Sequence, residues 1–200
     1  MNKERFEAFS DGVFAFAITL LVLGVALPAF RRPPSDTELT SALVGLWPNV
    51  VAFALSFGVI GIMWQNHHSF FRVVTRVDRT TVFLNLLLLG GTVFIAFATA
   101  TLGSYPTTHS ATFLYGLTLS YTATIYNLLP MHLIRRKAFT ASVTDEALKG
   151  MLVAYRVGWV TYVCAMLISL WMPLLSFALY IAITVYYLVP RGLDQDLEGV

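Results

Sequence analysis

Four long stretches of the chain contain no Asp, Glu, Lys or Arg, and they outline the fold. These stretches cover residues 12–30, 39–71, 80–134 and 157–190. A run of roughly 20 apolar residues can cross the hydrocarbon core of a bilayer as a helix, and a helix satisfies its own backbone polar groups there. The pattern therefore predicts an all-α membrane protein.

Two of these stretches are long enough to hold two spans each. The third stretch is divided by a polar turn at residues 104–110, and the fourth is divided near Pro173. The sequence thus predicts a single domain, residues 1–200, with six transmembrane helices per subunit. Their approximate bounds are 6–28, 41–67, 80–103, 111–134, 150–171 and 174–190.

Basic residues give the expected orientation of these spans. Most of them fall between the second and third spans or between the fourth and fifth, namely Arg72, Arg76, Arg79, Arg135, Arg136, Lys137 and Lys149. Cytoplasmic loops carry an excess of Lys and Arg, and Arg31 and Arg32 oppose this assignment only mildly. We therefore expect a multi-pass protein of the cell membrane with both termini in the cytoplasm.

Composition narrows the classes of function. Apolar residues make up 57% of the chain and charged residues 12%, about half of the charged fraction of a typical soluble domain. The net charge of +2 is too small to indicate a nucleic-acid partner. A lone cysteine, Cys164, allows no intrachain disulfide and no cysteine-based metal site. We expect no cofactor and no resident metal.

The first apolar stretch differs from an ordinary span because its few polar residues occupy particular positions on the helix. At about 100° per residue, an apolar stripe and a hydroxyl share one helix face: Phe16, Thr19, Leu20, Leu23 and Leu27. Copies of this face around a common axis would form a narrow apolar constriction, which can gate ion flow by dewetting. The alternative is ordinary packing against neighbouring helices, because every membrane helix has some apolar face.

Two motifs resemble the transmembrane protein 175 family of potassium channels. One opens the first span and the other ends the second: Arg5-x-x-x-Phe9-Ser10-Asp11 followed by Thr19-Leu20-Leu21, and Trp64-x-x-His67-His68 with Phe70 and Arg72. The length and the six-span layout are also similar. The resemblance implies a homotetramer in membrane lipid that conducts K⁺ through a central pore lined by the first helices.

The resemblance also assigns roles within that pore. It implies hydrophobic layers at Phe16, Leu20 and Leu23 and a pore-facing hydroxyl at Thr19. Prokaryotic relatives commonly have Ile or Leu where this chain has Phe16, and the bulkier ring could seal the pore, turn aside, or shift the gate to the two leucines.

A carboxylate lies close to the start of the first helix. Ser10 and Asp11 could cap the helix N-terminus, but Asp11 lies nearly opposite the Phe16 stripe, which favours an inter-helical role over direct ion coordination. Its expected partners are Arg5, Asn66 and His67. The resemblance implies that this polar network, which includes Ser10, holds the pore helix in place.

The pair His67 and His68 allows three interpretations: a hydrogen-bonded structural histidine, a pH sensor or a metal site. Adjacent helical residues point about 100° apart, and no other ligand lies at a suitable spacing. We therefore favour the structural interpretation.

The sequence favours a potassium-selective or potassium-preferring channel over two other classes. A small secondary transporter or exporter subunit is the alternative, although such proteins usually show inverted repeats and broken helices around a midplane site. An intramembrane enzyme would need a nucleophile or a metal set, and the chain offers neither. We therefore expect no enzymatic activity.

Overall fold

The computed structural model describes residues 3–141 and 143–188, and the regular elements in this part of the chain are helices. Within it, strand pairing is limited to a single bridge between Val74 and Phe139. The all-α prediction is confirmed for these residues. The elements are α1 (Lys3–Leu20), the 3-10 turn η1 (Leu21–Gly24), α2 (Asp36–Gly45), α3 (Trp47–Arg72), α4 (Arg79–Ser104), α5 (His109–Arg135), α6 (Asp145–Ile168) and α7 (Pro173–Leu188).

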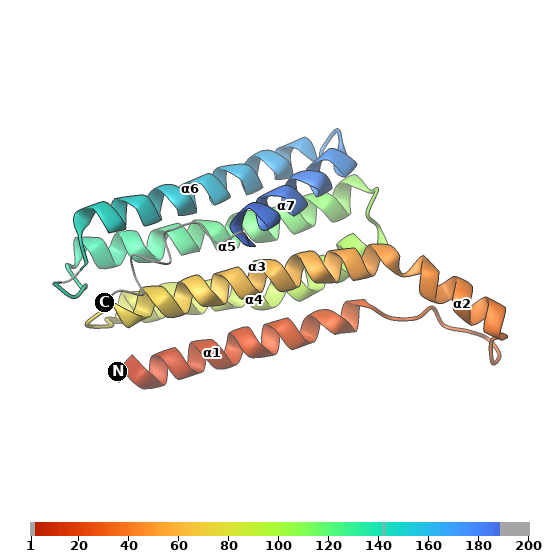
Figure 1. Ribbon diagram of the computed structural model, residues 1–200, viewed down its shortest axis with the longest axis horizontal. Helices are drawn as coiled ribbons and strands as arrows, with labels where there is room; N and C mark the ends of the chain where they lie inside the picture. The colour runs from red at the N-terminus through yellow and green to blue at the C-terminus, as the bar shows by residue number, and fades with distance from the viewer. Residues whose placement is uncertain (1–2, 142, 189–200) are drawn as a thin grey trace.

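The long helices run side by side in an elongated bundle (Figure 1). α1 lies along one side of the bundle and α6 along the opposite side, while α4 packs against α1, α3 and α5 between them. α7 packs against α3, α5 and α6, and α2 projects from one end of the bundle (Figure 1). The position of α1 leaves one of its faces uncovered by the other described residues.

Close helix packing depends on small residues at particular points. A Cβ atom at Gly116 of α5 would overlap the hydroxyl of Tyr180, which donates a hydrogen bond to the Thr112 carbonyl at 3.2 Å. Tyr180 and Tyr115 are both fully buried, and their rings meet edge to face. Gly116 therefore lets a tyrosine from α7 enter the core between α5 and α7.

Four helical segments are long and apolar enough to cross a membrane by length and composition: residues 3–24, α3, α4 and α6. α7 is apolar but has only 16 residues. α5 has 27 residues with several hydroxyl and imidazole side chains. The bounds of α4 and α5 lie within about two residues of those predicted for the third and fourth spans.

The first span is shorter than predicted. The helix begins at Lys3 rather than residue 6 and ends at Gly24 rather than residue 28. Asn49 of α3 donates a hydrogen bond to the Gly24 carbonyl at 3.0 Å, and a Cβ at Gly24 would lie 3.0 Å from that of Ala100. This packing fixes the end of the helix, so Leu27 lies outside it and does not continue the stripe.

The second predicted span, 41–67, is divided in two. α2 ends at Gly45 and α3 begins at Trp47, because Pro48 stands in the first turn of α3, where its missing N–H costs nothing. α2 has its own capping box, in which Ser35 and Glu38 bond reciprocally. α3 then continues to Arg72, five residues beyond the predicted end.

The last two predicted spans also shift. α6 begins at Asp145 rather than residue 150, because the Thr144 side chain accepts a hydrogen bond from the Ala147 N–H and caps the helix. α7 spans Pro173–Leu188, close to the predicted start at residue 174. The predicted end at residue 190 lies outside the described residues.

A polar clamp joins the α3–α4 loop to the α5–α6 loop. The Thr75 N–H donates to the Ala138 carbonyl at 2.7 Å. Asp78 accepts hydrogen bonds from the N–H and hydroxyl of Thr81 and faces His132 at 3.0 Å and Arg136 at 3.5 Å. The Thr81 bonds, helped by His132, lower the pKa of Asp78 to about 2. The carboxylate therefore stays ionised throughout the neutral range.

Candidate functional site

One face of α1 is packed into the bundle. Its buried residues recur at intervals of three or four: Phe6, Ser10, Phe14, Ala17 and Leu21. This spacing is that of an amphipathic helix, and each of these side chains is at most 2% exposed. α1 packs this face against α3 and α4, which fixes the rotation of the helix about its axis.

The opposite face carries most of the predicted pore residues. Phe16 is 63% exposed and Leu23 is 71% exposed, and Thr19 is exposed between them. We call Phe16, Thr19 and Leu23 the α1 ridge. Leu20 is only half-buried, so it lies at the edge of this ridge.

The hydroxyl of Thr19 has a fixed orientation. Its Oγ1 donates a hydrogen bond to the Phe16 carbonyl at 2.8 Å, which turns the hydroxyl hydrogen toward the helix. The oxygen keeps its lone pairs free to accept, because a hydroxyl has one donor and two acceptor sites. The α1 ridge therefore presents an oxygen acceptor between two apolar side chains.

A buried chain of hydrogen bonds connects α1, α4 and α3. The Asn85 Nδ2 donates to Ser10 Oγ at 2.9 Å, and Ser10 Oγ donates to the Phe6 carbonyl at 3.0 Å. The Asn85 Oδ1 lies 2.8 Å from His67 Nε2. An amide oxygen can only accept, so His67 carries its proton on Nε2 and donates. All three side chains are at most 2% exposed, and every link in the chain has a donor and an acceptor.

The surroundings of His67 fit the structural interpretation of this residue. Its ring contacts the rings of Phe14 and Phe71, with centroids 5.3 and 4.6 Å apart. His68 points elsewhere and stacks on Trp64 at 6.0 Å. In the described parts of the chain, no three His, Cys, Asp or Glu side chains are grouped as a metal site.

Asp11 joins α1 to α3 through an unexpected partner. Its Oδ1 accepts a hydrogen bond from the Trp64 indole at 2.9 Å, whereas the sequence suggested Arg5, Asn66 and His67. The capping alternative is wrong, because α1 begins at Lys3 and Asp11 lies inside the helix. The bond does join two helices, but we expected a buried inter-helical role for Asp11, and this bond is exposed.

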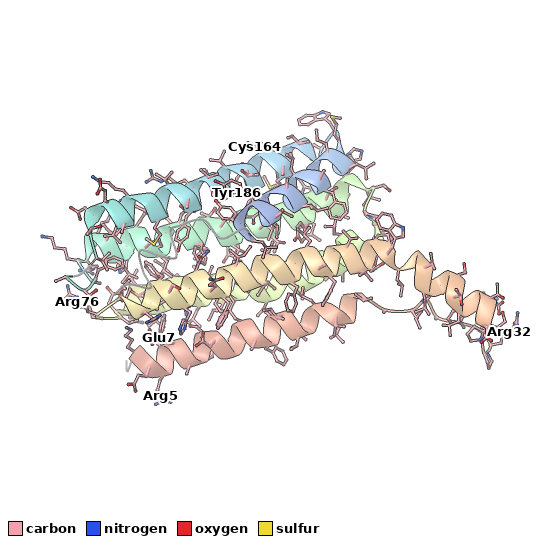
Figure 2. All side chains as sticks on the ribbon, viewed as in Figure 1. Arg5, Glu7, Arg32, Arg76, Cys164 and Tyr186 are labelled. Atoms are coloured by element: carbon pink, nitrogen blue, oxygen red, sulfur yellow. The ribbon has the colours of Figure 1, made fainter. Side chains whose placement is uncertain are left out.

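The other two expected partners lie in different places. Arg5 borders a groove of about 360 Å³ between α1 and α4, together with Phe9 and Leu86. Figure 2 shows Arg5 on the side of α1 away from α3, and Glu7 on the side toward it. Asn66 lines a cavity between α3, α5 and α6, because neighbours on a helix point about 100° apart and His67 faces α4.

Sequence reasoning missed Asn85 and the role of Trp64 as a donor. Asn85 is the one amide within the apolar run of α4, and an isolated polar residue in a membrane span is a functional candidate by default. This signal was present in the sequence. The pairing of Asn85 with Ser10 and His67 depends on three-dimensional packing and had no sequence signal.

Three comparisons show what this chain is similar to. The family described as "Endosomal/lysosomal potassium channel TMEM175" matches residues 5–96, the segment that holds α1, α3 and most of α4. A potassium channel of Streptomyces collinus is 40% identical over 168 residues, covering 81% of this chain and 80% of that protein. A potassium channel of Chamaesiphon minutus is 35% identical over 187 residues, covering 92% of each chain.

A solved structure resembles the whole fold. It is the crystal structure of a lysosomal potassium-selective channel TMEM175 homolog from Chamaesiphon minutus, with 34% identity and a TM-score of 0.82. The match covers 94% of this chain and 96% of that one.

Proposed function

This chain belongs to the TMEM175 family of potassium channels, and we propose that it conducts K⁺ as a homotetramer through a central pore lined by α1. The α1 ridge is the observation that supports this proposal. Phe16 and Leu23 are more than half exposed although α1 is anchored along its other face. Four copies of the ridge around one axis would cover these side chains and enclose a path for ions.

In this proposal the gate is an apolar constriction formed by Phe16, Leu20 and Leu23. Phe16 and Leu23 point most directly away from the bundle, and Leu20 borders them. A ring of such side chains resists wetting and closes the pore without a charged group. Thr19 offers the hydroxyl oxygens that can replace part of the hydration shell of the ion.

The buried hydrogen bonds have a supporting role. Ser10, Asn85 and His67 hold α1 to α4 and α3, and Asp11 with Trp64 adds a second tie. A pore helix must keep its rotation while its outer face meets water, and both ties lie on faces other than the ridge. Arg5 and Asn66 lie outside these two ties and have separate surroundings.

The proposed topology has six spans with both termini in the cytoplasm of a multi-pass cell-membrane protein. In this proposal α5 and α7 cross the membrane together with the four segments that are long and apolar enough to do so. The Asp78 clamp supports this arrangement, because it joins the α3–α4 and α5–α6 connections, in or near which seven of the thirteen Lys and Arg residues lie. Cytoplasmic loops carry this excess of basic residues.

Reconstitution of the purified full chain in liposomes tests the function. We expect a K⁺ current without a coupled ion, a reversal potential that follows the K⁺ gradient more closely than the Na⁺ gradient, and the mass of a tetramer. Saturable flux that depends on the gradient of a second ion would instead support the alternative, a small secondary transporter or exporter subunit.

A further inference from the structure

A cavity of about 80 Å³ lies between α3, α5, α6 and the last turn of α7. α7 packs against both α3 and α6, and in Figure 1 it lies between them over part of their length. Tyr187 in the last turn of α7 lines the cavity. α7 therefore acts as a spacer that holds α3 and α6 apart.

Several polar groups around this cavity are bonded within the protein, but the Asn127 Oδ1 is buried without a hydrogen-bond partner among the described residues. The Tyr126 hydroxyl donates to the Met63 carbonyl at 3.1 Å, and the Tyr187 hydroxyl donates to the Ala154 carbonyl at 2.6 Å. The amide nitrogen of Asn127 donates to the carbonyls of Ala123 and Tyr155. With these donors engaged, the cavity offers mainly aromatic and aliphatic carbon, which suits an apolar ligand.

On α6, a basic residue stands in the sequence between residues that line the cavity. Arg156 is exposed and adjoins Tyr155, which lines the cavity; Trp159, one turn further along, also lines it and is 37% exposed. Arg156 lies 11 residues after Asp145, the first residue of α6, or about 16 Å along the helix axis. It therefore lies within the apolar segment formed by α6. An exposed charge there is costly unless it reaches the membrane surface or meets an opposite charge.

We propose that this cavity and Arg156 form a phospholipid site. The Arg156 guanidinium binds the lipid phosphate, and one acyl chain enters the carbon-lined cavity beside Trp159. Arginine is well matched to phosphate because its planar fork donates two parallel hydrogen bonds. α6 lies on the side of the molecule opposite α1 (Figure 1), so the proposed site is separate from the proposed pore.

The test uses the full chain in phosphatidylcholine vesicles that contain a phosphatidylglycerol with a photoreactive diazirine near the end of one acyl chain. After irradiation, mass spectrometry maps the labelled residues. We expect adducts on Tyr126 or Tyr155, which line the cavity and are not exposed. Adducts confined to the exposed α6 residues Val157 and Val160 would overturn the proposal.

Matched variants separate the two parts of the site. Ala123→Leu fills the cavity and should remove the internal adducts, whereas Ala182→Leu on the exposed face of α7 should leave them unchanged. Gly158→Ala gives a milder block that preserves the fold, since its new methyl would lie 3.4 Å from the Tyr187 hydroxyl. Internal adducts that persist in both cavity variants would overturn the proposal.

Arg156→Gln should reduce the internal adducts, and Lys149→Gln, an exposed basic residue earlier on the same helix, should not. Equal labelling of Arg156→Gln and the unmodified chain would overturn the assignment of the phosphate to Arg156. Equal loss in both charge variants would indicate general attraction of anionic lipid and would also overturn it.

Discussion

α1 and α6 lie on opposite sides of the molecule, and both leave apolar side chains uncovered (Figure 1). On α6 these are Val153, Val157, Val160 and Leu167. On α1 and the η1 turn that continues it they include Phe16 and Leu23, with the Thr19 hydroxyl between them. Exposure of apolar surface alone therefore cannot distinguish a pore helix from a lipid-facing one.

The difference lies in what holds each helix in place. α1 is held by a fully buried chain of side-chain hydrogen bonds through Asn85, in addition to the Asp11–Trp64 bond. On α6, side chains of α5 and α7 donate to the backbone carbonyls of Ala154, Tyr155 and Ala165. The side-chain bond from the Trp159 indole to Thr124, at 2.8 Å, is exposed. A helix that lines a pore must keep one rotation, whereas a lipid-facing helix tolerates small rotations because lipid adapts to it.

The largest expected effect comes from breaking the buried chain. Asn85→Leu removes the donor to the Ser10 oxygen and the acceptor of the His67 N–H. This should cost about 3 kcal/mol, since each buried group that loses its partner costs about 1–3 kcal/mol. Thr124→Val removes the acceptor of the exposed Trp159 bond on α6 and should cost about 1 kcal/mol or less. Thermal unfolding of the purified protein in detergent measures both losses, and equal losses would contradict the contrast between the two helices.

The second test concerns the uncovered faces themselves. Leu23→Ala widens the proposed constriction and should raise the resting K⁺ leak on the order of tenfold, equivalent to about 1.4 kcal/mol of barrier. Val160→Ala makes a similar truncation on the exposed face of α6 and should leave the flux unchanged. Fluorescent flux assays in liposomes, normalised to the amount of assembled protein, compare the two variants. Equal flux from both would remove Leu23 from the gate.

A smaller effect is expected at Thr19. Thr19→Val keeps the shape of the side chain but removes the oxygen on the α1 ridge, so K⁺ conductance should fall and the K⁺/Na⁺ reversal potential should shift. Thr161→Val on α6 is the control, because Thr161 also donates its hydroxyl to its own helix, at 2.9 Å to the Val157 carbonyl. Currents from single channels in planar bilayers measure both variants. An unchanged reversal potential in Thr19→Val would show that the hydroxyl plays no part in selectivity.

Much of the fold could be predicted because charge is excluded from the membrane core. The uncharged runs gave the order of the helices and placed α4 and α5 within about two residues. The helix ends that the sequence did not predict correctly depend on contacts between helices. Gly24 ends its helix against Asn49 and Ala100, and no local pattern in the sequence indicates this contact.

The site was predictable to a different extent on each face of α1. Periodicity alone placed Phe16, Thr19 and Leu23 on one face, and the structure leaves all three exposed. Periodicity cannot tell which residue of another helix will meet Asp11, because Trp64, Asn66 and His67 lie within one turn of each other and point in different directions. Trp64 and Asn66 are only two positions apart on α3. The Trp64 indole binds Asp11, whereas the Asn66 amide lines a separate cavity.

The smallest expected effect tests the clamp that links the two sides of the molecule. Asp78 caps α4, which packs against α1, and contacts His132 and Arg136 just before the loop that leads to α6. Its pKa is lowered to about 2 in the folded chain, against about 3.9 for an unfolded aspartate. A lowered pKa means that the folded state favours the ionised form, so the carboxylate stabilises the fold above about pH 4 and this contribution is lost as the pH falls toward 2.

Because the Asp78 side chain is 39% exposed, we expect Asp78→Asn to cost about 1 kcal/mol or less at pH 5. Thermal unfolding at pH 5 and pH 2.5 should show the difference between Asp78→Asn and the unmodified chain shrinking at the lower pH. Asp36→Asn in the projecting helix α2 provides the comparison, and a difference for Asp78→Asn that grows in acid would mean that the clamp depends on something other than the ionised carboxylate.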